Sequence, residues 1–238
     1  MSTAPIIRLY LFFATENDTA LILRRSGKKM YNLISWDRAN DSFVEGQWLR
    51  KSVRYEDCAL SPDGRHFIYA VHDANPDTRA TGCYTVLCRA PWFTALALFP
   101  HEWGFQSGGY FLDNKLYRIK ADAACKDILE QNTQVLRVVQ GKVTHSCRSG
   151  LRLTNGEPAP LSRALRDQLL NNAKLPRVIS LDRYETQAGC LYRTDGPKRV
   201  LIHDFTEMEP RFEPAPYGQP PKDPMKTGWH PADEAGAR

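Results

Sequence analysis

The sequence predicts an all-β protein built from consecutive antiparallel meanders, because short apolar segments alternate with compact polar turns along most of the chain. The clearest turn is Ser61-Pro62-Asp63-Gly64, in which proline presets φ, aspartate can bond the local backbone and glycine closes the turn. Residues 67–71 follow this turn and are apolar at both odd and even positions. We therefore expect this strand to be covered on both of its faces.

The expected strands fall into four sets, each joined internally by short turns. The sets comprise residues 6–13, 19–24, 30–36 and 43–49; residues 55–60, 67–71, 83–89 and 95–99; residues 108–112, 115–119, 135–139 and 142–147; and residues 178–181, 184–187, 190–193 and 199–205. Strands joined by such short turns pair as antiparallel neighbours. Each set is therefore expected to form one meander.

A recurring turn indicates how the meanders are arranged. Asp18, Asp63 and Asp113 mark turns that lie 45 and 50 residues apart, which is a spacing typical of propeller blades. We predict a small or incomplete β-propeller-like arrangement. Short strands and regular turns also suit a two-sheet β-sandwich, which is the alternative architecture.

Two segments depart from the strand pattern. Within residues 158–173, Leu161, Ala164, Leu165 and Leu169 fall on one helical face, so we expect one inserted helix there. After residue 213 the chain becomes rich in proline and loses its periodicity. The predicted organisation is one domain over residues 1–213 with this helical insertion, followed by a Pro-rich tail over 214–238 that is disordered or laid along the surface.

Two resemblances add to this interpretation. The turn at residues 61–64 followed by Phe67-Ile68-Tyr69 resembles the repeat of TolB-like and WD-repeat β-propellers, where such a turn joins two inner strands of a blade. More locally, residues 89–100, 108–114, 203–208 and 215–217 resemble segments of uncharacterised bacterial proteins. The second resemblance implies a bacterial origin and one continuous domain, and it implies no function.

Composition narrows the class of protein. The 42% hydrophobic content is that of a globular chain, and the net charge of +5 is too small to imply nucleic acid by itself. The first apolar run is interrupted by Arg8 and has no basic leader or cleavage site behind it, so a secretory signal is not expected. The six cysteines are scattered, which favours reduced core thiols. We expect a soluble, cytoplasmic protein with no membrane partner.

Motifs for catalysis or metal binding are not evident. The sequence contains no Gly-x-Ser-x-Gly elbow, phosphate loop or His-Glu-x-x-His helix. Cys83 and Cys88 would face opposite sides of one strand, and the adjacent pairs His72-Asp73 and His203-Asp204 also point to opposite faces. We therefore expect no metal, no cofactor and no catalytic residue. The competing hypothesis is a propeller-type hydrolase whose site gathers from different blades.

The sharpest charge feature is a basic hairpin tip. Arg24, Arg25, Lys28 and Lys29 flank a Ser-Gly turn, so all four would lie close together. The favoured interpretation is a solvated turn that discourages edge pairing. Nucleic-acid binding through these cations is the runner-up.

Large aromatic residues near strand ends and in loops are candidate anchors for a partner. Trp92 and Trp103 are favoured because Pro91 and Gly104 place them in loops. The full set of candidate partner-binding residues is Trp36, Trp48, Trp92, Phe93 and Trp103. The predicted function is a non-enzymatic module that binds another protein, and one form of it would be a bacterial inhibitor or immunity protein that occludes a toxin or effector.

Overall fold

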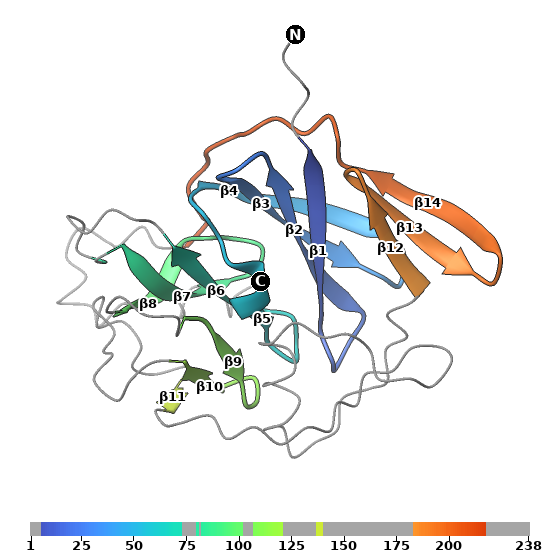
Figure 1. Cartoon of the computed structure of the whole chain (residues 1–238). Helices are drawn as coiled ribbons and strands as arrows, with labels where there is room; N and C mark the ends of the chain where they lie inside the picture. Colours follow the sequence, from blue (N-terminus) through green and yellow to red (C-terminus); the bar gives the residue numbers. More distant parts are fainter. Residues whose placement is uncertain are drawn as a thin grey trace, which may run out of the picture.

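The computed structural model describes residues 6–72, 80, 82–101, 107–120, 137–139 and 183–217 of the chain. These residues form an all-β structure of four sheets (Figure 1). The strands are β1 (Ile7–Phe13), β2 (Thr19–Ser26), β3 (Met30–Asp37) and β4 (Ser42–Arg50); β5 (Ala59–Leu60), β6 (His66–His72), β7 (Cys83–Arg89) and β8 (Ala95–His101); β9 (Gly109–Phe111), β10 (Leu116–Ile119) and β11 (Arg137–Val139); and β12 (Tyr184–Gln187), β13 (Cys190–Asp195) and β14 (Lys198–Asp204).

The predicted meanders are confirmed in most of the described chain. The first sheet is β1-β2-β3-β4, the second is β5-β6-β7-β8 and the fourth is β12-β13-β14, each with antiparallel neighbours in chain order. The third sheet differs, because β11 pairs parallel to β10. The strands expected at 142–147 and 178–181, the helix near 158–173 and the tail beyond residue 217 lie outside the described residues.

One strand boundary was predicted incorrectly. Residues 55–60 do not form one strand, because Tyr55–Asp57 makes a 3₁₀ turn, η1, before the short strand β5. The backbone N–H groups of Asp57 and Cys58 donate to the carbonyl oxygens of Arg54 and Tyr55, at 3.0 and 3.3 Å. These local bonds use backbone groups that a strand would need for its ladder.

The sheets pack face to face, with an apolar core at each contact. The first sheet lies between the fourth and the second, and the third packs on the far face of the second. Side chains of one strand therefore enter two cores in alternation, as the period of two requires. On β2, Leu21 and Leu23 face the second sheet while Ala20 and Ile22 face the fourth. On β6, Phe67, Tyr69 and Val71 pack against the first sheet and Ile68 against the third, which confirms that this strand is covered on both faces.

The turns marked by Asp18, Asp63 and Asp113 are linked by hydrogen bonds. Asp63 donates its backbone N–H to Asn114 Oδ1 at 2.9 Å, and its carbonyl oxygen accepts from Asn17 Nδ2 at 2.8 Å. Asn114 also donates through Nδ2 to Glu16 Oε2 at 2.7 Å. The repeated turns of the first three sheets are thus bonded at one end of the molecule, where β1, β5 and β9 lie side by side (Figure 1).

The fourth sheet departs from this repeat. Thr186 of β12 donates to the carbonyl oxygen of Leu9, and Tyr184 stacks on Phe13 with ring centroids 5.7 Å apart. A Cβ on Gly189 would lie 3.0 Å from Ile7. Strand β12 therefore runs antiparallel to β1, whereas blades related by a propeller rotation would run in the same sense. The described sheets form a face-packed meander stack, and propeller closure stays a prediction.

Candidate functional site

Three of the five aromatic residues expected at a partner surface are core residues. Trp36, Trp48 and Phe93 are at most 4% exposed. Each tryptophan has its indole N–H satisfied nearby: Trp36 donates to Asp41 and Trp48 to Glu45, at 3.2 and 2.8 Å. Their expected role as surface anchors is therefore wrong, because large apolar rings gain most by filling the spaces between the sheets. Trp92 is half-buried against the core between the second and third sheets, and Trp103 lies outside the described residues.

The basic hairpin forms as predicted, with one correction. Gly27 at its tip has φ of +67°, and Lys28 and Lys29 beside it are exposed. Arg25 is half-buried; its Nε donates to the carbonyl oxygen of Gly27 at 2.8 Å. Arg24 does not belong to the exposed tip, because it is only 1% exposed.

Arg24 holds the segment that follows β14, residues 205–217, which we call the C-terminal strap. Its guanidinium donates to the carbonyl oxygens of Phe205, Thr206 and Met208 at 2.8, 3.3 and 3.4 Å. It also lies 5.3 Å from the centre of the Trp48 ring. Burial lowers the pKa of Arg24 from its ordinary value, and the negative charge of Glu45 opposes that shift. The arginine nevertheless stays charged at neutral pH, and its donors fasten the strap to the first sheet.

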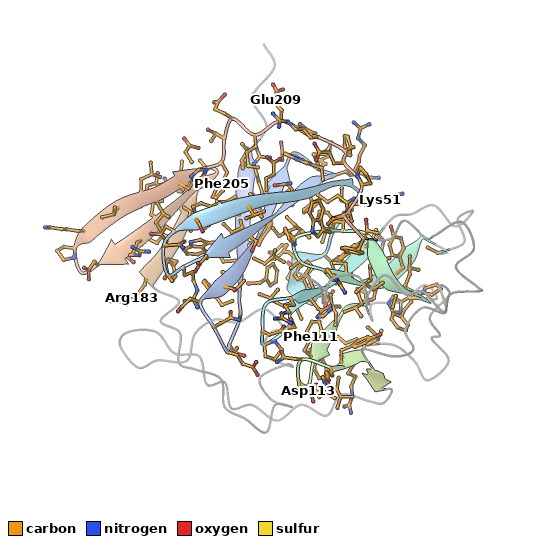
Figure 2. All side chains as sticks on the ribbon, turned by 180° about the vertical axis from the view of Figure 1, so that it is seen from behind. Lys51, Phe111, Asp113, Arg183, Phe205 and Glu209 are labelled. Carbon is orange, nitrogen blue, oxygen red and sulfur yellow. The ribbon has the colours of Figure 1, made fainter. Side chains whose placement is uncertain are left out.

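The strap then crosses to the second sheet. Gln47 Nε2 donates to the carbonyl oxygen of Glu213 at 3.0 Å, while its Oε1 accepts from Phe93 N and Thr94 Oγ1. At the far end, Ala215 and Tyr217 are buried between the second and third sheets. Figure 2 shows the strap leaving Phe205 and passing Glu209 above the end of β4 at Lys51. The first residues of the predicted tail are therefore neither disordered nor only laid along the surface, because Ala215 and Tyr217 are part of a core.

The sheet register adds cations to the hairpin tip that sequence reasoning missed. Arg8 lies directly opposite Arg25, and Arg50 lies opposite Met30, beside the same turn. Four strands spaced by about 4.8 Å place the backbones of these residues within about 15 Å across the end of the sheet, with Arg8 and Arg25 on the face toward the second sheet and Arg50 on the face that the strap covers. We call this surface the basic end; it comprises Arg8, Arg25, Lys28, Lys29, Arg50 and Lys51, each exposed or half-buried. The strand pairing predicted for residues 6–49 would have been sufficient to identify the basic end from the sequence.

Two exposed apolar residues accompany these cations. Ile6 precedes β1 and is 72% exposed, and Phe212 on the strap is 58% exposed. The Arg50 guanidinium lies 5.8 Å from the centre of the Phe212 ring. Among the described residues, the other large exposed hydrophobic side chains lie on β4 and β14, away from this end, at Val44, Val200 and Leu201.

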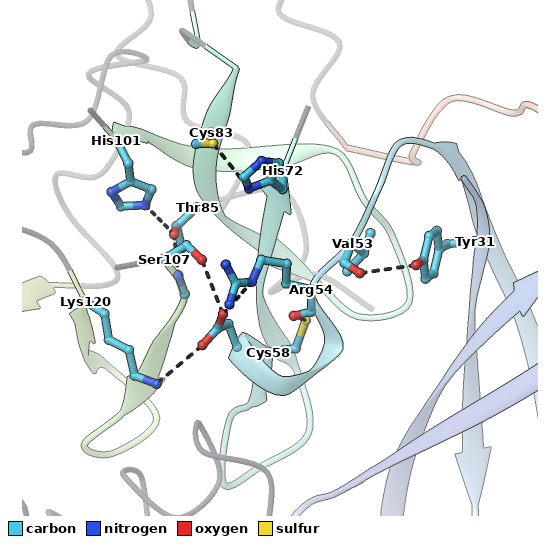
Figure 3. Close-up of polar contacts among 12 residues, drawn as sticks. Tyr31, Val53, Arg54, Cys58, His72, Cys83, Thr85, His101, Ser107 and Lys120 are labelled. Atoms are coloured by element: carbon cyan, nitrogen blue, oxygen red, sulfur yellow. Dashed lines mark hydrogen bonds and ion pairs between the residues drawn. The ribbon is translucent and has the colours of Figure 1, made fainter. Parts of the chain in front are cut away.

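A second polar cluster lies between the second and third sheets (Figure 3). The carboxylate of Asp57 pairs with Arg54 Nε at 3.0 Å and with Lys120 Nζ at 3.9 Å. It also accepts a hydrogen bond from Ser107 Oγ at 3.3 Å. The Asp57 side chain is only 5% exposed. Its oxygens face three groups of the chain itself, which ties η1 to the third sheet.

Beside Asp57, a hydroxyl links two further elements. Thr85 Oγ1 accepts from the backbone N–H of Gly108 at 2.7 Å and lies 2.6 Å from His101 Nε2. The hydroxyl proton is then available for Nε2, so the imidazole can accept there in its neutral form. Burial lowers the pKa of His101 to about 4, in keeping with a neutral ring.

The cysteines and histidines among the described residues do not assemble a nucleophilic site. Cys83 Sγ lies 3.6 Å from His72 Nδ1, and burial raises the pKa of that thiol. A raised pKa keeps the sulfur protonated at neutral pH, which is the less reactive form. Cys88 faces the opposite side of β7, as expected, and donates to the carbonyl oxygen of Phe67. His203 lies on β14 against Phe43, so the first sheet separates it from His72.

Within the described ranges, no three His, Cys, Asp or Glu side chains lie where they could hold a metal ion. Among the same residues, no helix has the length and apolarity needed to cross a membrane. A scan against protein-family models finds no matching family, and comparisons with curated proteins and with solved structures find no match. The resemblances noted in the sequence therefore stay predictions.

The two buried histidines, His66 and His101, are expected to lower the free energy of unfolding in mild acid. Burial lowers the pKa of both His66 and His101 to about 4. Because each pKa is lower in the folded than in the unfolded state, their contribution is present above about pH 6.5 and is lost as the pH falls toward 4. We expect each histidine to cost about 2 kcal/mol between pH 7 and pH 5.

Urea unfolding of wild type and His101→Gln at these two pH values measures this effect. The free energy of unfolding of the variant should fall by about 2 kcal/mol less than that of the wild type. Equal losses in the two proteins would show that His101 is not kept neutral by the fold.

Proposed function

We propose that the protein is a non-enzymatic module that binds an acidic surface of another protein through its basic end. The concentration of six cations around one hairpin and the adjoining strand ends is the observation that supports this. Glu209 and Glu213 of the strap offset them only in part. Complementary charge steers association and selects partners without requiring any reaction. An inhibitor or immunity protein that occludes a bacterial toxin or effector is one form of such a module.

The hydrolase alternative has less support. In the cluster of Figure 3, the Asp57 oxygens face Arg54, Ser107 and Lys120, and Thr85 connects Gly108 with His101. These contacts satisfy one another and hold the sheets together. His72 on β6 lies opposite Cys83, which lies opposite His101, so His72 borders this cluster. His203 and Asp204 lie on β14 of the fourth sheet, and Asp73 lies outside the described residues.

Charge reversal at the hairpin tip tests the proposal. A tagged protein is used to capture partners from host cells, and the affinity of the purified partner is then measured for Lys28→Glu/Lys29→Glu. We expect affinity to fall at least about tenfold at 150 mM salt, because two steering cations become repulsive. The matched control is Lys115→Glu/Lys198→Glu, two exposed lysines at the β9–β10 turn and at the start of β14. Equal losses from both variants would contradict the proposal.

Nucleic acid is the rival ligand of the same cations. A fluorescein-labelled 20-nucleotide single strand, titrated at 50 and 200 mM salt, distinguishes the two. Phosphate contacts would make affinity fall steeply with salt and would be lost in the Lys28→Glu/Lys29→Glu variant. Strong binding of this kind without any protein partner would overturn the protein-binding proposal.

A further inference from the structure

Phe212 combines three properties that a binding anchor needs. Its side chain is 58% exposed, although an aromatic ring of this size gains from leaving water. It lies beside the Arg50 guanidinium, at 5.8 Å from the ring centre, so it adjoins the basic end. It also occupies a part of the strap whose backbone is fixed on both sides.

The fixation comes from the buried Arg24 and the half-buried Gln47. On one side Arg24 holds the carbonyl oxygens of residues 205, 206 and 208, and on the other Gln47 holds that of Glu213 at 3.0 Å. Tyr217 is buried four residues further on, where its hydroxyl donates to the carbonyl oxygen of Thr94 at 2.9 Å and accepts from the backbone N–H of Arg89 at 3.1 Å. A side chain on such a segment loses little backbone entropy when a partner binds it.

We infer that Phe212 is the apolar anchor of the basic end, and that it enters an apolar pocket of a partner protein whose rim carries carboxylates. This rests on the proposed function and names the chemistry of the partner's site. The ring supplies desolvation energy, and Arg50 with the hairpin lysines supplies the charges that complement the rim. It assigns to the strap the role that the sequence suggested for the tryptophans.

The test begins with a photocrosslinking residue, benzoylphenylalanine, placed at position 212 or at position 201. Leu201 on β14 is a matched control, since it is 52% exposed and lies on another sheet. After irradiation in host cells, we expect a protein adduct from position 212 and none from position 201. Adducts of equal strength from both positions, or none from position 212, would overturn the inference.

The partner identified by crosslinking is then purified, and its affinity is measured for Phe212→Ala, Phe212→Leu and Leu201→Ala. We expect Phe212→Ala to weaken binding about 30-fold, Phe212→Leu to weaken it less, and Leu201→Ala to change it less than about twofold. Unchanged unfolding midpoints establish that the variants are folded. An affinity of Phe212→Ala within threefold of the wild type would overturn the inference.

The affinities of the crosslinked partner for the two sets of variants distinguish this inference from the proposed function. If Lys28→Glu/Lys29→Glu weakens binding and Phe212→Ala does not, the basic end is the docking surface and the anchor is wrong. If only Phe212→Ala weakens binding, the anchor is retained and the electrostatic proposal fails. The loss caused by Phe212→Ala should persist at 500 mM salt, because burial of an apolar ring is not screened.

Discussion

Replacing Gly108 by alanine is expected to destabilise the fold by more than about 4 kcal/mol. Gly108 has φ of +86°, a backbone conformation that costs an alanine about 1 to 2 kcal/mol. A Cβ there would also lie 2.1 Å from the carbonyl oxygen of Asp57. The backbone would have to move, and the Gly108 hydrogen bond to Thr85 would move with it. Chemical denaturation of the purified variant measures the loss.

Gly196→Ala is the matched control for this substitution. Gly196 has φ of +58° but nothing within 4 Å of an added Cβ. We expect it to cost only about 1 kcal/mol, from backbone strain. A similar loss at both positions would mean that the close approach of Gly108 to η1 does not exist in solution.

Asp57→Asn is expected to lower the free energy of unfolding by about 3 to 5 kcal/mol. The substitution removes the anion that faces Arg54 and Lys120, whose side chains are 35% and 10% exposed. Leaving a cation buried after removal of its partner is among the costliest single changes. Asp195→Asn, at the exposed β13–β14 turn, should change stability by less than about 0.5 kcal/mol.

A double variant tests the cause of that loss. Asp57→Asn combined with Lys120→Met should be more stable than the sum of the two single losses predicts, because neither partner then leaves a buried charge behind. Additive losses would show that Asp57 acts through its hydrogen bonds and not through the ion pair.

The strand sets and the turns were predictable because they depend on local chemistry. The turn at residues 61–64 closes with Gly64 N–H donating to Ser61 at 2.9 Å, and Gly64 has φ of +77°. The near-regular spacing of the turns at Asp18, Asp63 and Asp113 suggested a repeated unit, but the hydrogen bonds between these turns were not predicted. The spacing of the turns does not determine the direction in which the strands of a later sheet run relative to the first sheet. The antiparallel orientation of β12 relative to β1 was therefore not predictable from it.

The site was less predictable because it depends on contacts between distant residues. Arg24 looks like its exposed neighbour Arg25 in the sequence, yet its partners lie 181 to 184 positions away. Period-two alternation places it on the face that the strap covers. Only Trp92 and Trp103 were assigned to loops from their neighbours; Trp36 and Trp48 were expected near the ends of predicted strands, and they lie within β3 and β4. Burial of a strand residue depends on which sheet packs over it.

Hydrogen-exchange protection on binding the crosslinked partner tests the basic end most directly. We expect the partner to slow exchange of backbone amides in three segments of the described chain: residues 26–30, residues 50–52 and the strap at 209–213. Exchange along β14 should change little. Protection concentrated on β14, with the hairpin tip and strap unchanged, would contradict the assignment of the basic end as the docking surface.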